Sequence, residues 1–146
     1  MKISTRGRYG LRMLLDIAEH QHNGYVSLKD ISERQSISKK YLEQIVPLFI
    51  SAGFLRTSRG HMGGYMLASD LSDYSVADVL RVTEGSLAPV SCLENGENRC
   101  PQADKCDTLF VWQGLMAAME NYLEGITLRD ILSRKVRKKQ EDYVLL

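Results

Sequence analysis

The stretch "SLKDISERQSISKKYLEQIVPLFISAGFLRTSRGHMGGYMLAS", residues 27–69, carries the start and stop signals of four successive elements. Ser27 followed three residues later by Asp30 is typical of a helix N-terminus. After the turn "QSIS", Ser38 is a suitable N-cap for the next helix, the third of the chain, which Gly53 ends. Two short strand-like segments, "FLRTS" and "YMLAS", then flank the glycine-rich loop "RGHMGG". This order predicts a helix-turn-helix followed by a β-hairpin wing.

Helical patterns also lie on both sides of this unit. An amphipathic helix is expected from about Thr5 to Gln21, because its apolar residues recur at helical spacing. Two further start signals, at Ser75 and Thr127, each have Asp three residues later. Between them, residues 107–124 carry apolar side chains on two helical faces, which predicts burial against both the chain's own domain and a second copy.

The predicted fold is mainly α-helical with a small β-hairpin wing, a winged helix-turn-helix joined to a long dimerisation helix. Residues 1–85 are expected to form the DNA-binding domain and residues 107–135 the dimerisation helix with a short C-terminal helix. Residues 136–146 read as a charged tail. Residues 86–106, which hold all three cysteines, form a loop longer than the roughly 12–15 residues of an ordinary connection, which favours a functional loop.

Composition and charge narrow the function. With 44% hydrophobic and 25% charged residues the chain resembles a soluble globular protein. No apolar run approaches the roughly 20 residues of a membrane span, so no membrane role is expected. Residues 1–69 hold ten Lys and Arg against five Asp and Glu (+5), residues 70–133 four against eleven (−7), and residues 134–146 five against two (+3). Only the first half is therefore expected to meet a polyanion, and the basic tail is open to a protein partner.

Three groups of polar residues in the basic half suit double-stranded DNA. Arginines crowd the positive N-terminal end of the first helix, where they are unfavourable unless a phosphate binds there; the alternative is solvated surface arginines. The third helix offers donors and acceptors on its outer face, and the wing loop adds two more. The predicted DNA-contacting residues are Arg6, Arg8, Ser38, Lys39, Lys40, Tyr41, Glu43, Gln44, Arg59 and His61.

The three cysteines, Cys92, Cys100 and Cys106, have the spacing C-x7-C-x5-C, without the close pairs typical of zinc sites. Nucleophilic catalysis would need a histidine partner, yet every histidine lies in the proposed DNA-binding half, so no enzyme is expected. Three thiolates in one loop can ligate an iron–sulfur cluster with a fourth group. The alternatives are redox-sensing thiols and thiols without a function. Reduced thiols fit a cytoplasmic protein.

Four segments, "MKISTRGRYGLRMLLDIA", "LKDISERQSISKKYLEQI", "GFLRTSRGHMGGYML" and "ITLRDIL", closely resemble the Rrf2 family of bacterial winged-helix transcription factors, which includes IscR-like, NsrR-like and CymR-like regulators. The resemblance implies a cytoplasmic homodimer that crosses its long helices and binds a palindromic operator. It also implies that Cys92, Cys100 and Cys106 are metal ligands of an iron–sulfur cluster, with 2Fe-2S favoured over 4Fe-4S.

The resemblance leaves the fourth ligand unknown. IscR-like proteins carry a histidine three residues after the last cysteine, where this chain has Leu109. NsrR-like proteins can use an acidic residue of the partner subunit, and the matching position here is Arg8. The CymR branch lacks the cysteines and acts through a cysteine-synthase partner. The alternatives are therefore a cluster-free regulator of cysteine and sulfur metabolism, or a metal-stabilised protein-interaction module.

Overall fold

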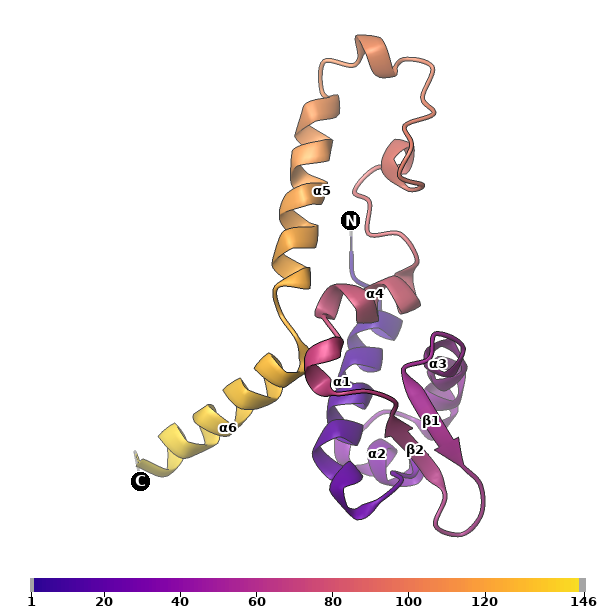
Figure 1. The fold of residues 1–146 in the computed structure, drawn as a ribbon, viewed down its shortest axis with the longest axis vertical. Coiled ribbons are helices and arrows are strands. Elements are labelled where there is room, and N and C mark those ends of the chain that lie inside the picture. Colours follow the sequence, from indigo (N-terminus) through magenta and orange to yellow (C-terminus); the bar gives the residue numbers. More distant parts are fainter. Residues whose placement is uncertain (1, 145–146) are drawn as a thin grey trace.

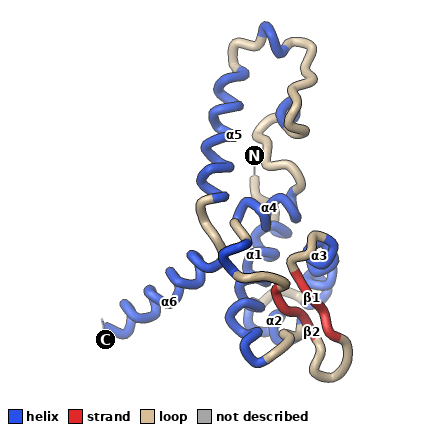
Figure 2. The backbone as a smooth tube through the Cα atoms, viewed as in Figure 1, coloured by secondary structure: helices blue, strands red, loops and turns tan. Residues whose placement is uncertain are grey.

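The computed structural model describes residues 2–144 and confirms a mainly helical fold with one two-stranded antiparallel hairpin (Figure 2). Its elements are α1 (Thr5–His20), α2 (Leu28–Gln35), α3 (Lys39–Ser51), β1 (Leu55–Ser58), β2 (Gly64–Leu67), α4 (Val76–Glu84), α5 (Leu109–Glu124) and α6 (Leu128–Val144). None of the described helices is both long and apolar enough to cross a membrane.

The predicted helix starts are confirmed by their caps. Ser27 Oγ accepts from the Asp30 N–H at 3.2 Å, and Ser38 Oγ accepts from the Tyr41 N–H at 3.2 Å. Ser75 forms a complete capping box: its Oγ accepts from the Asp78 N–H while its own N–H donates to Asp78 Oδ2. The same exchange recurs between Thr127 and Asp130. Each cap satisfies backbone groups that the first helical turn leaves without partners.

The winged unit comprises α1 to α3 and the hairpin, with α4 packed on α1 (Figure 1). In the hairpin Leu55 lies opposite Leu67, and both are buried. The base of the wing is fixed by two 2.8 Å backbone bonds between Val26 and Tyr65. A Cβ at Gly64 would lie 2.3 Å from the Val26 carbonyl oxygen, so the close approach needs glycine. The core draws on every element of the unit: Met13, Leu14, Ile17, Val26, Ile31, Leu42, Ile45, Phe49, Leu55 and Leu67.

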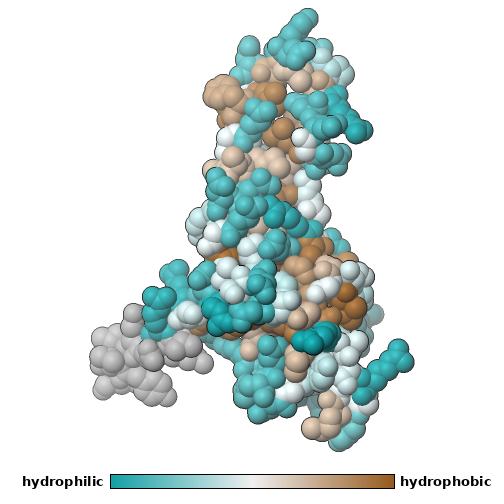
Figure 3. All heavy atoms as spheres, in the orientation of Figure 1, coloured by the Kyte–Doolittle hydropathy of each residue, from teal (hydrophilic) through white to brown (hydrophobic). Residues whose placement is uncertain are grey.

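A long arm rises from the winged unit, made of α5 and the cysteine loop that precedes it (Figure 1). Although α5 is largely apolar in sequence, none of its residues is buried, and Phe110 and Tyr122 are 73% and 70% exposed. Apolar surface is visible along the arm and at its junction with the winged unit (Figure 3). Such a helix lacks a partner on one side, which agrees with the two apolar faces seen in the sequence.

Two boundaries differ from the prediction. Helix α5 begins at Leu109, two residues later than expected. Helix α6 is long rather than short, because it continues through Val144 into the segment that reads as a charged tail; residues 145 and 146 lie outside the described residues. Residues 134–144 contain neither glycine nor proline and are rich in strong helix formers, so charge alone was a poor reason to expect a tail there.

A buried carboxylate joins α1 to α2. Asp16 is only 1% exposed, yet its carboxylate accepts three bonds from the Arg34 guanidinium, the shortest at 2.7 Å, and one from Gln35 Nε2 at 2.9 Å. The bond to Asp16 raises the pKa of Arg34. A buried charge is tolerated when it is paired and fully hydrogen-bonded, as it is here. The last turn of α2 is therefore held against α1 immediately before the turn into α3.

We expect Arg34→Met to lower the free energy of unfolding by about 2–3 kcal/mol, because it leaves a carboxylate in the core without its cation. The loss is smaller than for a fully buried pair, since the Arg34 side chain is 34% exposed and water can reach the site. Arg34→Lys keeps the charge but not the bidentate geometry, so its free energy of unfolding should lie between those of the parent and of Arg34→Met. Urea unfolding measures all three proteins; an Arg34→Met variant as stable as the parent would contradict this role.

Candidate nucleic-acid interface and cysteine loop

Helix α3 has one face in the core and one in solvent. Leu42, Ile45, Val46 and Phe49 are buried on the inner face. The other side holds predicted DNA-contacting residues, all exposed, and no described residue bonds to their side chains: Lys39, Lys40, Glu43 and Gln44. The helix therefore presents free donors and acceptors along its outer face, as a recognition helix must.

Two residues predicted to contact DNA at the start of α3 have partners inside the domain. Ser38 Oγ caps α3 through the Tyr41 N–H, and the half-buried Tyr41 ring packs edge-on against Tyr9 of α1 with ring centroids 5.5 Å apart. Ser38 therefore fixes the start of α3, and Tyr41 packs its first turn against α1. A contact of either residue with DNA stays a prediction.

The arginines of α1 do not act as one group. Arg6 and Arg8 are exposed, but two residues along a helix correspond to a rotation of about 200°, so they leave α1 on different sides. Arg12 lies over the Tyr9 ring at 5.3 Å and donates to both the side chain and the backbone carbonyl of Gln35. Arg12 thus belongs to the contact between α1 and α2.

The N-terminal end of α1 already has an anion beside it. Glu84, the last residue of α4, accepts from the Ser4 hydroxyl at 2.5 Å and from the Ser4 N–H at 3.3 Å. Ser4 Oγ in turn accepts from the Gly7 N–H at 3.1 Å and caps the helix. The charge that balances this helix end is therefore supplied by the chain itself, where the sequence suggested a bound phosphate. No local pattern could reveal a partner 80 residues away.

The wing loop between β1 and β2 carries Arg59 and His61, both exposed and without a bonded partner among the described residues. The hairpin ends project beyond the rest of the winged unit (Figure 1). Met62 is 82% exposed beside these two residues and was not singled out in the sequence. The loop thus presents a cation, an imidazole and an apolar side chain together.

The structure brings two of the three cysteines together. Cys92 is half-buried and Cys100 exposed, and both line one hollow with Asn95, Glu97 and Arg99. Cys106 is exposed outside this hollow, three residues before α5 begins. Among the side chains that the structure describes, no three of Cys, His, Asp or Glu converge in an arrangement that could hold a metal ion. Joint ligation by all three thiols would thus require the segment that carries Cys106 to move.

The chemistry around the thiols suits a metal–sulfur group. The Cys100 N–H donates to Asn98 Oδ1 at 3.0 Å, while Asn98 Nδ2 is buried without a partner and so remains a free donor. Hydrogen bonding with Thr108, whose Oγ1 lies 3.6 Å from Cys106 Sγ, lowers the pKa of the Cys106 thiol. A lower pKa favours the thiolate, which is the form that ligates metals. The donor set therefore fits an iron–sulfur group in kind, although not in its present arrangement.

A helix-turn-helix with a hairpin wing, whose third helix offers unpaired cations to solvent, defines a winged-helix DNA-binding protein. Residues 3–134 match the family model of Rrf2, described as an iron-dependent transcriptional regulator. The chain belongs to the Rrf2 family of transcription regulators.

Individual relatives agree with this assignment. The protein rrf2 of Nitratidesulfovibrio vulgaris is 44% identical over 133 residues, which cover 90% of this chain and 87% of that one. The regulator IscR of Serratia proteamaculans is 35% identical, with 92% and 81% covered. The structure of CymR, the global cysteine regulator of B. subtilis, superposes with a TM-score of 0.75 at 35% identity and covers 92% of this chain and 98% of CymR. Because the family model, IscR and CymR are all named as transcription regulators, the expectation that the chain is not an enzyme is confirmed.

Proposed function

We propose that this Rrf2-family regulator binds a palindromic operator as a homodimer, and that an iron–sulfur cluster held by its cysteine loop controls this binding. The observation that carries the DNA-binding part is the outer face of α3, where four polar side chains, Lys39, Lys40, Glu43 and Gln44, have no bonded partner among the described residues. Unpaired donors and acceptors at the start of a recognition helix suit base edges and phosphates.

A second copy of the chain is the proposed partner of α5. The arm exposes Phe110, Val111 and Tyr122 to solvent, and a helix that pairs with its own copy would bury such residues. At the base of the arm, Arg81 bonds to Glu124 at 2.5 Å and lies 3.6 Å from Glu120, which ties α5 to α4 and so to the winged unit. Two winged units joined in this way would present two recognition helices to two half-sites.

The proposed cluster would be held by Cys92, Cys100 and Cys106, with 2Fe-2S favoured and the fourth ligand supplied by another group. Support comes from the three thiols in one loop, the free donor of Asn98, and the description of the family as iron-dependent. When bound, such a group cross-links its ligands and can gain or lose an electron. The other residues of the loop would fix the path of the backbone between α4 and α5. A reducing cytoplasm would keep the thiols available as ligands.

Substitutions on α3 and the wing test the proposed interface. We expect Lys39→Ala and Arg59→Ala to weaken binding to operator and random duplexes alike, because phosphate contacts carry no sequence information. In contrast, Glu43→Ala should mainly change base preference, by about 1–3 kcal/mol at the base pair that it reads. Fluorescence anisotropy with a duplex selected from random sequence and with single-base variants of that duplex measures both effects.

A matched control for the lysine is Lys29→Ala, which removes one exposed charge from α2 rather than α3. Equal losses for Lys29→Ala and Lys39→Ala would mean that net charge, not the position on α3, sets affinity. A Glu43→Ala protein that discriminated between the selected duplex and its variants as well as the parent does would remove Glu43 from base reading.

Anaerobic purification tests the proposed cluster. We expect iron and acid-labile sulfide together with visible absorption, all lost on replacing any one of Cys92, Cys100 and Cys106 by Ser, because each supplies a thiolate ligand. A control substitution, Ser91→Ala, alters the same hollow without removing a thiol. A colourless parent protein, even after reconstitution with iron and sulfide, would contradict the cluster and favour a cluster-free regulator that acts through a protein partner.

A further inference from the structure

We propose that Glu84 is a positioning residue that links the cysteine loop to the DNA-facing end of α1. Its carboxylate takes the place beside the helix end that a DNA phosphate would otherwise use, and it withdraws when a phosphate binds or when the loop moves. The inference rests on the proposed DNA-binding function and deepens it, since it names the route by which the loop and the operator would affect each other.

The first observation is how closely Glu84 fits the start of α1. Its Oε1 receives both the hydroxyl and the backbone N–H of Ser4, and a Cβ added to Gly7 would lie 2.4 Å from the same oxygen. Only a residue without a side chain at position 7 leaves room for the carboxylate. The first turn of α1 has no acidic residue of its own, so Glu84 is the carboxylate that faces this positive helix end.

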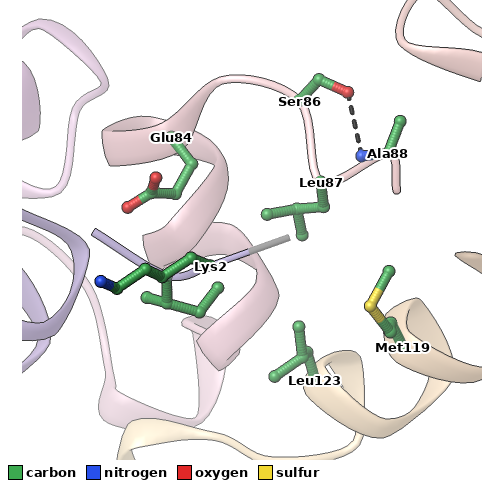
Figure 4. A pocket seen from close by; sticks show the side chains of 8 residues that line it. Lys2, Glu84, Ser86, Leu87, Ala88, Met119 and Leu123 are labelled. Atoms are coloured by element: carbon green, nitrogen blue, oxygen red, sulfur yellow. Dashed lines mark hydrogen bonds between the residues drawn. The ribbon is translucent and has the colours of Figure 1, made fainter. Parts of the chain in front are cut away.

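The second observation is where Glu84 lies along the chain. It is the last residue of α4, and Gly85, with φ of +79°, turns the backbone directly into the cysteine loop. Figure 4 shows Glu84 and Lys2 on one side of a pocket, with Leu87 of the loop and Met119 and Leu123 of α5 around it. The N-terminal segment, the start of the loop and the arm therefore meet at this carboxylate.

The third observation is what lies next to the end of α1 that Glu84 contacts. Arg6 and Arg8 both lie in this first turn and are exposed, and the Arg8 guanidinium donates to Thr5 Oγ1 at 3.1 Å. One turn further along, Tyr9 packs on Tyr41 in the first turn of α3. The N-terminal part of α1 thus adjoins the start of the recognition helix. A negative charge held there opposes an incoming phosphate, and its removal frees the helix end for one.

The coupling works in both directions because linkage is reciprocal. A loop rearrangement that pulls on Gly85 draws Glu84 away from Ser4 and so strengthens phosphate binding. Conversely, a phosphate that replaces Glu84 at the helix end releases the start of the loop. The carboxylate is therefore the moving part shared by the two regions.

The decisive variant is Glu84→Gln, which keeps an oxygen that can accept from Ser4 but removes the charge. We expect it to bind the selected duplex and random duplexes about 3- to 10-fold more tightly at low salt. The slope of log affinity against log salt should steepen by about 0.9, the value for one more phosphate contact. The control is Glu19→Gln, which makes the same charge change near the other end of α1, where Glu19 pairs with Lys135 at 2.7 Å. It should leave the slope unchanged.

Hydrogen exchange of the backbone amides of residues 84–88 and of Val90 provides a second readout that does not depend on affinity. DNA should speed exchange in the parent protein, whereas Glu84→Gln should exchange fast with or without DNA. An unchanged salt slope in Glu84→Gln, or an equal change in Glu19→Gln, would overturn the inference, as would weaker DNA binding by Glu84→Gln at unchanged thermal stability. A parent protein without salt dependence would instead contradict the proposed DNA binding itself.

Discussion

The carboxylate of Asp16 is the constraint on which the DNA-binding unit depends. It is buried on the inner face of α1, where Arg34 balances its charge and Gln35 donates a hydrogen bond to it from the end of α2. The next residue, Ser36, has a left-handed backbone with φ of 54°, and α3 begins three residues later. The ion pair fixes the last turn of α2. It therefore also fixes where α3 begins after the short connection. Arg12 strengthens the same junction through Gln35.

The arm is attached to the winged unit less firmly than α2 and α3 are attached to α1. Its helix has no fully buried residue: Met119 and Leu123 are only half-buried beside Leu87 of the loop. Arg81, whose pKa is raised mainly by its bond to Glu124, ties the helix to α4. Exposed ion pairs of this kind contribute little to stability, so the arm is held less firmly than α2 and α3. The cysteine loop joins this loosely attached arm to the firmly held winged unit. A regulator needs such an arrangement if a change in the loop is to alter DNA binding.

Local signals made much of the fold predictable. The caps at Ser27, Ser38, Ser75 and Thr127 are interactions between residues three apart, so the sequence alone reveals them. The length of α6 also has a local cause: residues 134–144 are charged but contain no glycine or proline, so the helix continues through them.

Contacts between distant residues could not be read in this way. The bond between Asp16 and Arg34 spans 18 positions, and that between Ser4 and Glu84 spans 80. A lone carboxylate on the apolar face of α1 was a visible hint of a buried partner, but it did not say which cation supplies it. The spacing of the cysteines likewise gives the donor set and not its geometry, since the loop has only two short 3-10 turns, Ser91–Leu93 and Ala103–Lys105, to fix its path.

The central claim is that two recognition helices, joined through paired arms, read two half-sites together. Light scattering of the complex with a palindromic duplex selected from random sequence tests it most directly, because the mass counts the chains. The account predicts two copies of the 16.5-kDa chain on each duplex, and a dimer of the free protein at micromolar concentration. A single chain on each duplex, bound as tightly to one half-site as to two, would contradict it.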